Sequence, residues 1–339
     1  MRTHARPLPA ASSSVCDGAG KHDSLERGMA AAFTTTGTTK TEETTNSAPW
    51  KMPWWRASSV RDYSILFWIC LIHITAAIGL VLCPIPGWRV MLGAIALMFI
   101  GGLGTTVAYH RAIAHRSLTL NPWARAVLIF FAMFNGSGAP ISWAAGHRLH
   151  HAKADTPDDI SSPIWGGFWW AHLRWLWQAG ELPVERYCPD LGGVSYRAWR
   201  WFQTPILALS YLGGLCFGPA AFFWLGAIRL CFALHAQCFV NSVCHTEPGV
   251  TVGQDSSRNV RWLALMHLFQ GENWHRNHHA RPGSARLGWN WRQPDGGYVF
   301  ILALEKLGLA TNVRHGGGAA SRADAKDLLG RADVLDPAA

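Results

Sequence analysis

Two long apolar segments dominate the middle of the chain. The first runs from Ser64 to Val107 and is interrupted only at Pro84–Gly87. The second, Thr204–Val243, is broken at Gly218–Pro219. A helix crosses a bilayer with about 20 residues. Each segment is long enough for two such helices, so the pattern predicts four membrane spans arranged as two hairpins.

A third apolar stretch, Ala126–Ala145, is less regular. It contains the polar and small run Asn135–Gly138 and also Pro140. Such a segment is compatible with a span or with a helix lying in the membrane interface.

The two ends of the chain differ from the middle. Residues 1–60 are rich in Ser, Thr, Ala and Gly, and no apolar run follows the early charges, which argues against a signal peptide. We expect a disordered N-terminal tail, with Met29 and Met52 as alternative starts. We expect a second disordered tail over residues 314–339 and a single membrane domain over residues 61–313.

Composition supports the membrane interpretation. Hydrophobic residues make up 49% of the 339 residues and charged residues only 15%, whereas soluble domains carry about 25% charged residues. These figures exclude a disordered chain and an ordinary cytosolic globule, and they favour an all-α integral membrane protein. The net charge of +9 accompanies no nucleic-acid-binding motif, so we expect a basic cytoplasmic face and no nucleic-acid partner.

The cysteines show no metal or disulfide spacing. Most of them lie in apolar runs and none forms a CxxC pair. We expect buried free thiols at all eight positions: Cys16, Cys70, Cys83, Cys188, Cys216, Cys231, Cys238 and Cys244.

Histidine is strongly over-represented, with 16 residues, and nine of these fall into four short clusters. In an HxxHH run on a helix, the three imidazoles share one face and should converge on one spot. In an HxxxxH run the two imidazoles are roughly 140° apart on an α-helix, so they would serve two neighbouring metals, or one metal where the helix ends. Nine imidazoles suit two ions of iron, zinc or copper. The candidate ligands are His110, His115, His147, His150, His151, His245, His275, His278 and His279.

The other internal histidines are isolated in the sequence. We interpret His73, His235 and His267 as hydrogen-bonded core residues, while His172 lies in an aromatic stretch and has no clear assignment.

The four clusters can meet only on one side of the membrane. The first hairpin returns His110 to the side where the chain began, so Ala126–Ala145 cannot be a single span. Because Lys and Arg concentrate in cytoplasmic segments, the cluster side and both termini are predicted to be cytoplasmic. The charges counted for this side are Arg111, Arg116, Arg148, Lys153, Arg276, Arg281 and Arg286.

The order of motifs HxxxxH, HxxHH, NSxxH and HxxHH resembles that of the membrane-bound fatty acyl desaturases of the stearoyl-CoA (delta-9) type. The second motif begins at His147 and the third spans Asn241–His245. The runs Asp255–Asn259 and Gly271–His275 also match the family. The resemblance covers about residues 61–312.

The resemblance implies a helical cytoplasmic cap on four spans and a centre of two Fe²⁺ ions held by the nine histidines. It implies that Asn241 holds a metal-bound water. The implied activity is O2-dependent formation of a cis delta-9 double bond in an acyl-CoA or acyl-lipid. The sequence contains neither a His-Pro-Gly-Gly motif nor a GxGxxG loop, so a separate ferredoxin-like or cytochrome b5-like electron donor is implied.

Several further residues are candidates for supporting roles. Carboxylates usually orient ligand imidazoles, and those near the motifs in sequence are Asp155, Asp158, Asp159 and Glu272. We expect Arg229, inside an apolar segment, to be paired or to extend towards the interface. Ala94 and Met98 are candidates for closing the far end of an acyl tunnel.

The chain departs from the animal acyl-CoA enzymes near the second motif. Gly138 and Ala145 align with their substrate-contacting Asn and Arg, whereas Trp143 matches. Gln237-Cys238 replaces the Thr-Trp found before NSxxH in many members. These differences leave the head group and the double-bond position open.

Two other functions remain compatible with the sequence. A hydroxylase or another oxygenase would use the same scaffold and the same hydrogen abstraction. A non-catalytic membrane metal-binding protein or transporter would carry ligands within its spans along a path.

Overall fold

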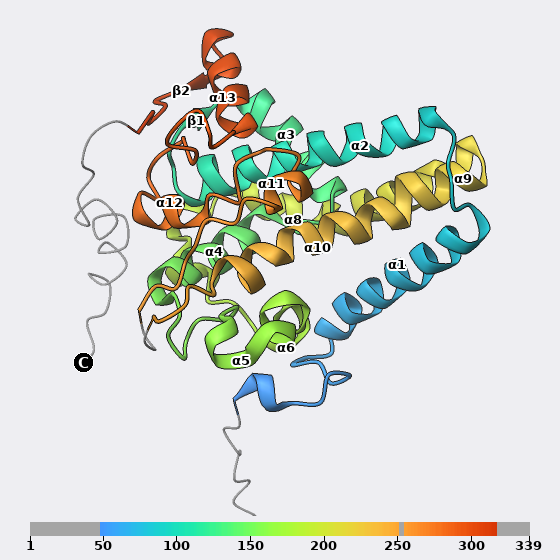
Figure 1. The fold of residues 1–339 in the computed structure, drawn as a ribbon, viewed down its shortest axis with the longest axis horizontal. Helices are drawn as coiled ribbons and strands as arrows, with labels where there is room; N and C mark the ends of the chain where they lie inside the picture. The colour runs from blue at the N-terminus through green and yellow to red at the C-terminus, as the bar shows by residue number, and fades with distance from the viewer. Residues whose placement is uncertain (1–47, 251–253, 317–339) are drawn as a thin grey trace, which may run out of the picture. The chain divides into compact units, whose positions relative to one another are not determined.

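The computed structural model describes residues 48–250 and 254–316, which form a mostly helical body (Figure 1). Three of its helices are long and apolar enough to cross a membrane: Asp62–Leu82, Trp88–Ala114 and Pro219–Cys244. The remaining parts of the two expected tails, residues 1–47 and 317–339, lie outside the described residues.

The first predicted hairpin is present. Helix α1 (Asp62–Leu82) leads through a short turn to α2 (Trp88–Leu103), which continues directly into a π-helix, η2 (Gly104–Ala114). The two arms are separated by a third helix, because α10 (Arg229–Cys244) lies between α1 and α2 and packs on both (Figure 1).

The second predicted hairpin is also present, but only one of its arms qualifies as a span. Its first arm is α8 (Val194–Leu212) followed by η5 (Gly213–Phe217), and Gly218 makes the turn with φ of 97°. The return arm comprises α9 (Pro219–Ala221), η6 (Phe222–Ile228) and α10 (Arg229–Cys244). The first half of α8 carries the exposed Arg197 and Arg200, which shortens its apolar part. The described residues therefore support three candidate spans where four were expected.

The third apolar stretch is not one helix. It is divided between α3 (Pro122–Phe134) and α4 (Pro140–Lys153). Gly136 and Gly138 between them have φ of 84° and 78°, which side chains other than glycine rarely adopt. This break confirms that Ala126–Ala145 is not a single span.

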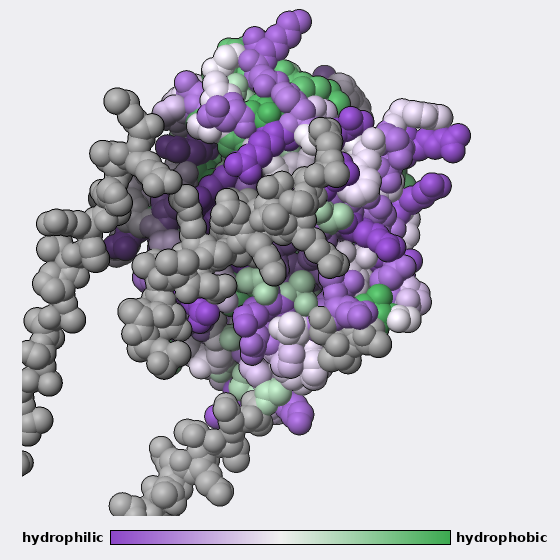
Figure 2. Space-filling model, turned by 90° about the vertical axis from the view of Figure 1, so that its left-hand side faces the viewer, coloured by the Kyte–Doolittle hydropathy of each residue, from purple (hydrophilic) through white to green (hydrophobic). Residues whose placement is uncertain are grey.

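Short elements gather at the end of the spans that carries the histidine motifs. A two-stranded antiparallel sheet pairs Thr119 with Thr311. Figure 2 views this end of the molecule, where hydrophilic side chains predominate. The elements not yet named are η1 (Pro49–Lys51), β1 (Thr119–Leu120), α5 (Pro163–Trp169), η3 (Trp170–Arg174), α6 (Trp175–Gln178), α7 (Val184–Tyr187), η4 (Pro189–Leu191), α11 (Leu263–Met266), α12 (His275–Ala280), α13 (Gly296–Lys306) and β2 (Ala310–Thr311).

The described end of the expected N-terminal tail is packed against the body. Arg174 donates hydrogen bonds to the carbonyl oxygens of Trp50 and Met52, and Trp177 donates to that of Trp54 at 2.8 Å. Trp50, Met52 and Trp54 were expected to belong to a disordered N-terminal tail ending at residue 60. The structure instead packs them against the body. At the other boundary, the Ala285 amide donates to the Arg314 carbonyl at 2.8 Å.

Two buried arginines fasten the segments around the histidine motifs. Arg111 donates to Asp295 at 2.9 Å, and Arg148 donates to Asp190 at 2.6 Å. Both were counted as charges on the cytoplasmic face. Because their guanidinium groups are buried in ion pairs, they hold the fold together and add little to that surface charge.

Arg229 is paired as expected, although its partners are neutral. Its guanidinium donates to Asn135 Oδ1 at 2.9 Å, to the Leu225 carbonyl at 2.7 Å and to the Ser210 hydroxyl. The hydrogen bonds satisfy a charge inside an apolar helix without a carboxylate.

The cysteines are less uniform than predicted. Among the described residues all are free, and Cys188, Cys238 and Cys244 are buried. Cys216, however, is exposed. Cys16 lies outside the described residues.

Candidate metal centre

His110 and His115 meet because the helix that carries them is a π-helix. In this geometry the amide of residue i+5 donates to the carbonyl of residue i, and the His115 amide donates to the His110 carbonyl at 3.1 Å. The wider turn brings residue i+5 closer to the face of residue i than an α-helix does. His115 follows the last helical residue, Ala114, and forms the C-terminal cap of the helix. Of the two arrangements left open for HxxxxH, the structure therefore favours both imidazoles facing one position. Their ring centroids are 5.1 Å apart.

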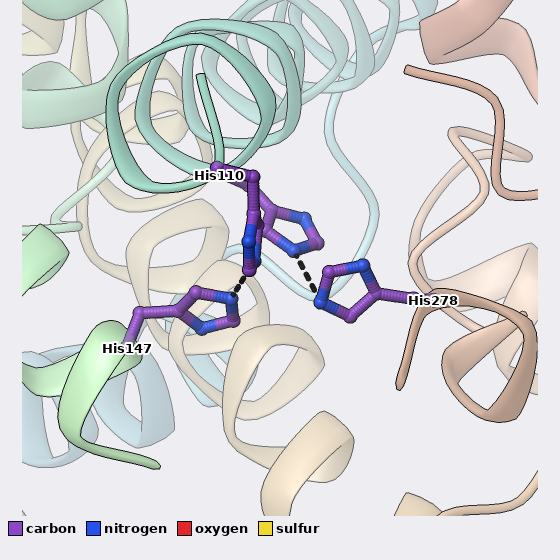
Figure 3. Close-up of side chains that lie close together, drawn as sticks. His110, His147 and His278 are labelled. Carbon is purple, nitrogen blue, oxygen red and sulfur yellow. Dashed lines mark hydrogen bonds between the residues drawn. The ribbon is translucent and has the colours of Figure 1, made fainter. Parts of the chain in front are cut away.

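Four imidazoles form the first histidine group, which we define as His110, His115, His147 and His278; one ring nitrogen from each lies within 4.8 Å of the others. The Nε2 atoms of His115 and His147 are 2.7 Å apart, and those of His110 and His278 are 3.0 Å apart. Figure 3 shows the labelled rings of His110, His147 and His278 turned towards a common point.

The second histidine group consists of His150, His245, His275 and His279, which satisfy the same distance limit. The Nε2 atom of His245 lies 3.1 Å from that of His150 and 2.9 Å from that of His275. Three of these four residues are buried.

His151 is placed between the two groups. Its Nε2 atom is 2.8 Å from Nε2 of His278 and 3.1 Å from Nε2 of His147. The structure thus brings all nine predicted histidines together, but it corrects their arrangement. The three imidazoles of each HxxHH motif do not converge on one spot, because residues i and i+3 of each motif contribute to different groups.

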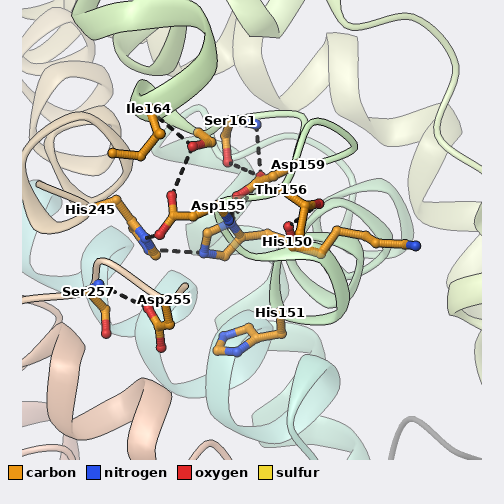
Figure 4. A network of polar contacts seen from close by, with 12 residues as sticks. His150, His151, Asp155, Thr156, Asp159, Ser161, Ile164, His245, Asp255 and Ser257 are labelled. Atoms are coloured by element: carbon orange, nitrogen blue, oxygen red, sulfur yellow. Dashed lines mark hydrogen bonds and ion pairs between the residues drawn. The ribbon is translucent and has the colours of Figure 1, made fainter. Parts of the chain in front are cut away.

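Several of the imidazoles have a carboxylate hydrogen-bonded to the Nδ1 atom of the ring. Glu272 accepts from His110 Nδ1 at 2.8 Å, and Asp159 accepts from His150 Nδ1 at 3.0 Å. Asp155 lies 3.1 Å from His245 Nδ1 (Figure 4). These contacts confirm three of the four candidate carboxylates.

Asp158 is the exception among those candidates, because it is exposed and pairs with Lys153 at 3.5 Å. Sequence reasoning missed Asp255 in this role. Asp255 lies 3.1 Å from His279 Nδ1, although it is far from His279 in sequence. The only indication in the sequence was that the run Asp255–Asn259 matches the family.

The hydrogen-bond pattern shows that the second histidine group suits a cation. A carboxylate can only accept, so the proton of each neutral imidazole facing one sits on Nδ1. The Nε2 atoms of His150 and His245 therefore present lone pairs to each other across 3.1 Å. A metal ion between such nitrogens would remove this repulsion, and carboxylate–histidine pairs are the usual support of metal ligands.

Burial also favours the neutral, metal-binding form of most of these rings. Burial, followed by the neighbouring imidazoles, holds the pKa values well below the ordinary value in His115, His147, His151, His275, His278 and His279. For Glu272, burial alone would raise the pKa. Its contacts with His110, Arg111 and Thr106 outweigh this and lower the pKa to about 2.

The isolated histidines are not all separate. His267 Nε2 lies 2.7 Å from the Ala236 carbonyl, in agreement with a core role. His73 and His235, by contrast, contact each other with their Nε2 atoms 2.9 Å apart, and His172 Nε2 lies 2.8 Å from His235 Nδ1. Because His73, His172 and His235 are far apart in the sequence, their contacts could not be predicted from it.

Comparison with known proteins is consistent with this geometry. A sequence model of the family described as fatty acid desaturase matches residues 86–292. The chain belongs to the fatty acid desaturase family. It is 35% identical to the delta-9 acyl-lipid desaturase 1 of Arabidopsis thaliana, over 79% of this chain and 87% of that protein. It is 32% identical to the sn-1 stearoyl-lipid 9-desaturase of a Synechocystis strain, over 74% and 80% of the two chains. A protein of the same name from Anabaena variabilis is 35% identical, over 70% and 89%.

As a fatty acid desaturase, the chain is an oxidoreductase that acts on fatty acyl chains. The three candidate spans suggest a membrane protein, and the histidine groups could bind metal. Both features fit the family.

The desaturase has a mainly apolar cavity of about 360 Å³ beside the histidine groups. Its size is within the usual range of ligand pockets. His147, His150 and His275 line it, as does Asn241. Trp143 also lines the cavity, and its ring stacks on His147 with centroids 4.9 Å apart.

Some of the residues that depart from the family pattern line this cavity, and one does not. Gly138, Gln237 and Cys238 line it, whereas Ala145 does not. Of the two candidates for the closed end of a tunnel, Met98 lines the cavity and Ala94 does not.

Removing one supporting carboxylate should weaken metal binding by the desaturase. Because Asp255 fixes the Nδ1 proton of His279, Asp255→Asn should lower metal affinity about tenfold. Asp158→Asn is the matched control, since Asp158 is also exposed but contacts no histidine of either group. Metal retained during titration with a chelator measures the effect. Equal retention by the two variants would contradict the role given to Asp255.

Acid should release the metal and destabilise the metal-free protein. Six imidazoles have folded-state pKa values well below their unfolded value of about 6.5. The unfolded chain therefore takes up protons first. The stability from these rings is complete above about pH 6.5 and is lost as the pH falls below it. Metal content and thermal midpoint should fall together over this range, and retention of both at pH 4.5 would oppose the prediction.

Proposed function

We propose that the protein is an O2-dependent delta-9 acyl-lipid desaturase that introduces a cis double bond at a di-iron centre. The observation that carries this proposal is the placement of two groups of four imidazoles beside an apolar cavity, which His147, His150 and His275 line. The names of the relatives from Arabidopsis thaliana and Synechocystis support the bond position and the lipid substrate.

The nine histidines would divide between two Fe²⁺ ions. His110, His115, His147, His151 and His278 would hold one ion, because His151 adjoins the first histidine group on two sides. The second histidine group would hold the other. Asn241 lies one helical turn before His245 and lines the cavity, so it would hold a water on the second ion.

Bound iron, together with O2, supplies the oxidising power needed to remove hydrogen from an unactivated methylene, which no acid or base side chain can do. In the balanced reaction, the acyl chain loses two hydrogens and O2 is reduced to two waters with two external electrons and two protons. The protein positions the chain. The stacked ring of Trp143 fixes one wall beside His147, while the apolar lining keeps water away from the chain.

The surroundings of the cavity are compatible with a lipid head group. Arg61 lines both the acyl cavity and a second pocket of about 700 Å³, which Arg197 and Arg200 also line. Guanidinium groups bind phosphate well. We propose that the anionic head group of an acyl-lipid occupies this second pocket while its chain enters the cavity.

The proposed topology has four spans, with α8 and η5 as the fourth, and both termini on the cytoplasmic side. The exposed arginines at the start of α8 would lie at the membrane interface. The active site would be cytoplasmic, within a helical cap, and the membrane domain would include the packed residues from Trp50 onwards, ahead of the boundary expected at residue 61. A separate ferredoxin-like or cytochrome b5-like donor would deliver electrons to this side.

A fatty-acid profile tests the proposed reaction directly. Host cells expressing the chain should accumulate a monounsaturated fatty acid with its double bond at position 9, located by gas chromatography–mass spectrometry. His278→Ala removes an imidazole shared by three close contacts and should abolish the product.

The other outcomes are equally informative. A hydroxylated fatty acid would replace the proposal with a hydroxylase. An unchanged profile, despite iron-loaded protein in the membrane and a co-expressed donor of each class, would contradict it. Exposed Arg276→Ala is the matched control within the same motif and should retain activity.

The length of the cavity should set the preferred acyl chain. Met98 is its outermost lining residue on α2, since Ala94, one turn earlier, does not reach it. Met98→Trp should shorten the cavity and shift products towards shorter chains by at least severalfold. Phe99→Trp, at the neighbouring position outside the cavity, is the control. The ratio of C16 to C18 products measures the shift, and equal ratios in both variants would refute this assignment.

A further inference from the structure

We propose that His73, Cys231 and His235 form a third metal site, separate from the histidine-motif centre and suited to Zn²⁺. His73 lies on α1, and the other two residues lie on α10. One potential ligand atom from each lies within 4.8 Å of the other two. None of the three belongs to a histidine motif.

The helix arrangement explains how these side chains meet. Cys231 and His235 are four residues apart and share one face of α10. Helix α1 packs along α10 and presents His73 to that face. The Nε2 atoms of His73 and His235 are 2.9 Å apart. The paired Nε2 atoms of the first histidine group show the same spacing, at 2.7 and 3.0 Å.

The hydrogen bonds around His73 orient a lone pair into the site. His73 Nδ1 lies 2.6 Å from the Ile69 carbonyl, which can only accept, so Nδ1 carries the proton. The Nε2 atom of the neutral ring is then an acceptor aimed at His235. A metal-bound histidine typically donates its other N–H in this way.

A second chain of contacts supports His235 from behind. His235 Nδ1 lies 2.8 Å from His172 Nε2, and His172 Nδ1 lies 2.9 Å from the Ser242 hydroxyl. Ser242 in turn donates to the Cys238 carbonyl at 3.0 Å. If Ser242 accepts from His172 Nδ1, then His172 Nε2 accepts from His235 Nδ1. His235 Nε2 therefore carries a lone pair as well, and a cation between the Nε2 atoms of His73 and His235 would bind both.

The ligand types select the ion. Two imidazoles and one thiolate suit Zn²⁺, whereas hard cations such as Mg²⁺ prefer oxygen. Three protein ligands leave a fourth position, which water can fill. The bound ion would join the first and third candidate spans. Through His172 and Ser242 it would also support the segment that carries Asn241.

Metal analysis of the purified full-length protein in detergent tests the site. After incubation with ZnCl₂ and removal of free metal, the wild type should retain about one zinc per chain in addition to its iron. Cys231→Ser and His73→Gln should each lose that zinc and keep the iron. Cys216→Ser is the matched control and should keep both, because Cys216 is exposed and distant from the cluster in sequence.

Thiol labelling of the wild type provides a measurement that does not depend on folding of the variants. Bound zinc should protect Cys231 from N-ethylmaleimide, and a strong zinc chelator should raise its labelling severalfold, as read by peptide mass spectrometry. Absence of zinc in the wild type, zinc retained by both variants, or labelling unaffected by chelator would each overturn the proposal. The contacts would then be a chain of neutral imidazoles in which Ser242 donates to His172.

Discussion

The lone pairs of neutral imidazoles are the constraint on which this structure depends. Carboxylates fix the Nδ1 protons of His110, His150, His245 and His279, and the opposite nitrogens of His150 and His245 face each other at 3.1 Å. Without a cation such an arrangement is repulsive. The surrounding helices, turns and ion pairs therefore hold a geometry whose stability is linked to a bound metal.

The segments that bring these imidazoles together are fastened by buried arginines. Arg111 and Arg148 each follow the first histidine of a motif, and each is anchored to an aspartate far along the chain. Breaking such a pair leaves an uncompensated buried charge, which is strongly destabilising. The same short motif thus supplies a nitrogen to the centre and a rigid attachment to the fold, which keeps the positions of the nitrogens fixed.

The apolar helices and the polar centre are complementary parts of one site. Met98 on α2 lines the cavity together with Trp143, His147 and Asn241. An acyl chain requires an apolar lining, whereas hydrogen removal requires a strong oxidant close to one methylene. This desaturase combines these requirements because His115 and His245 follow directly on two of its candidate spans.

The sequence by itself determined both hairpins, the break between α3 and α4, and the nine histidines, because apolar length, glycine and motif spacing are local properties of the chain. Tertiary structure alone decided how the histidines divide. The π-helix aligns His110 with His115, and α4 and α12 each send neighbouring imidazoles into different groups. It also decided that Asp255 rather than Asp158 supports a histidine, and that His73 meets His235. These pairings join residues distant in sequence, and only the packing of separate helices sets the distances between them.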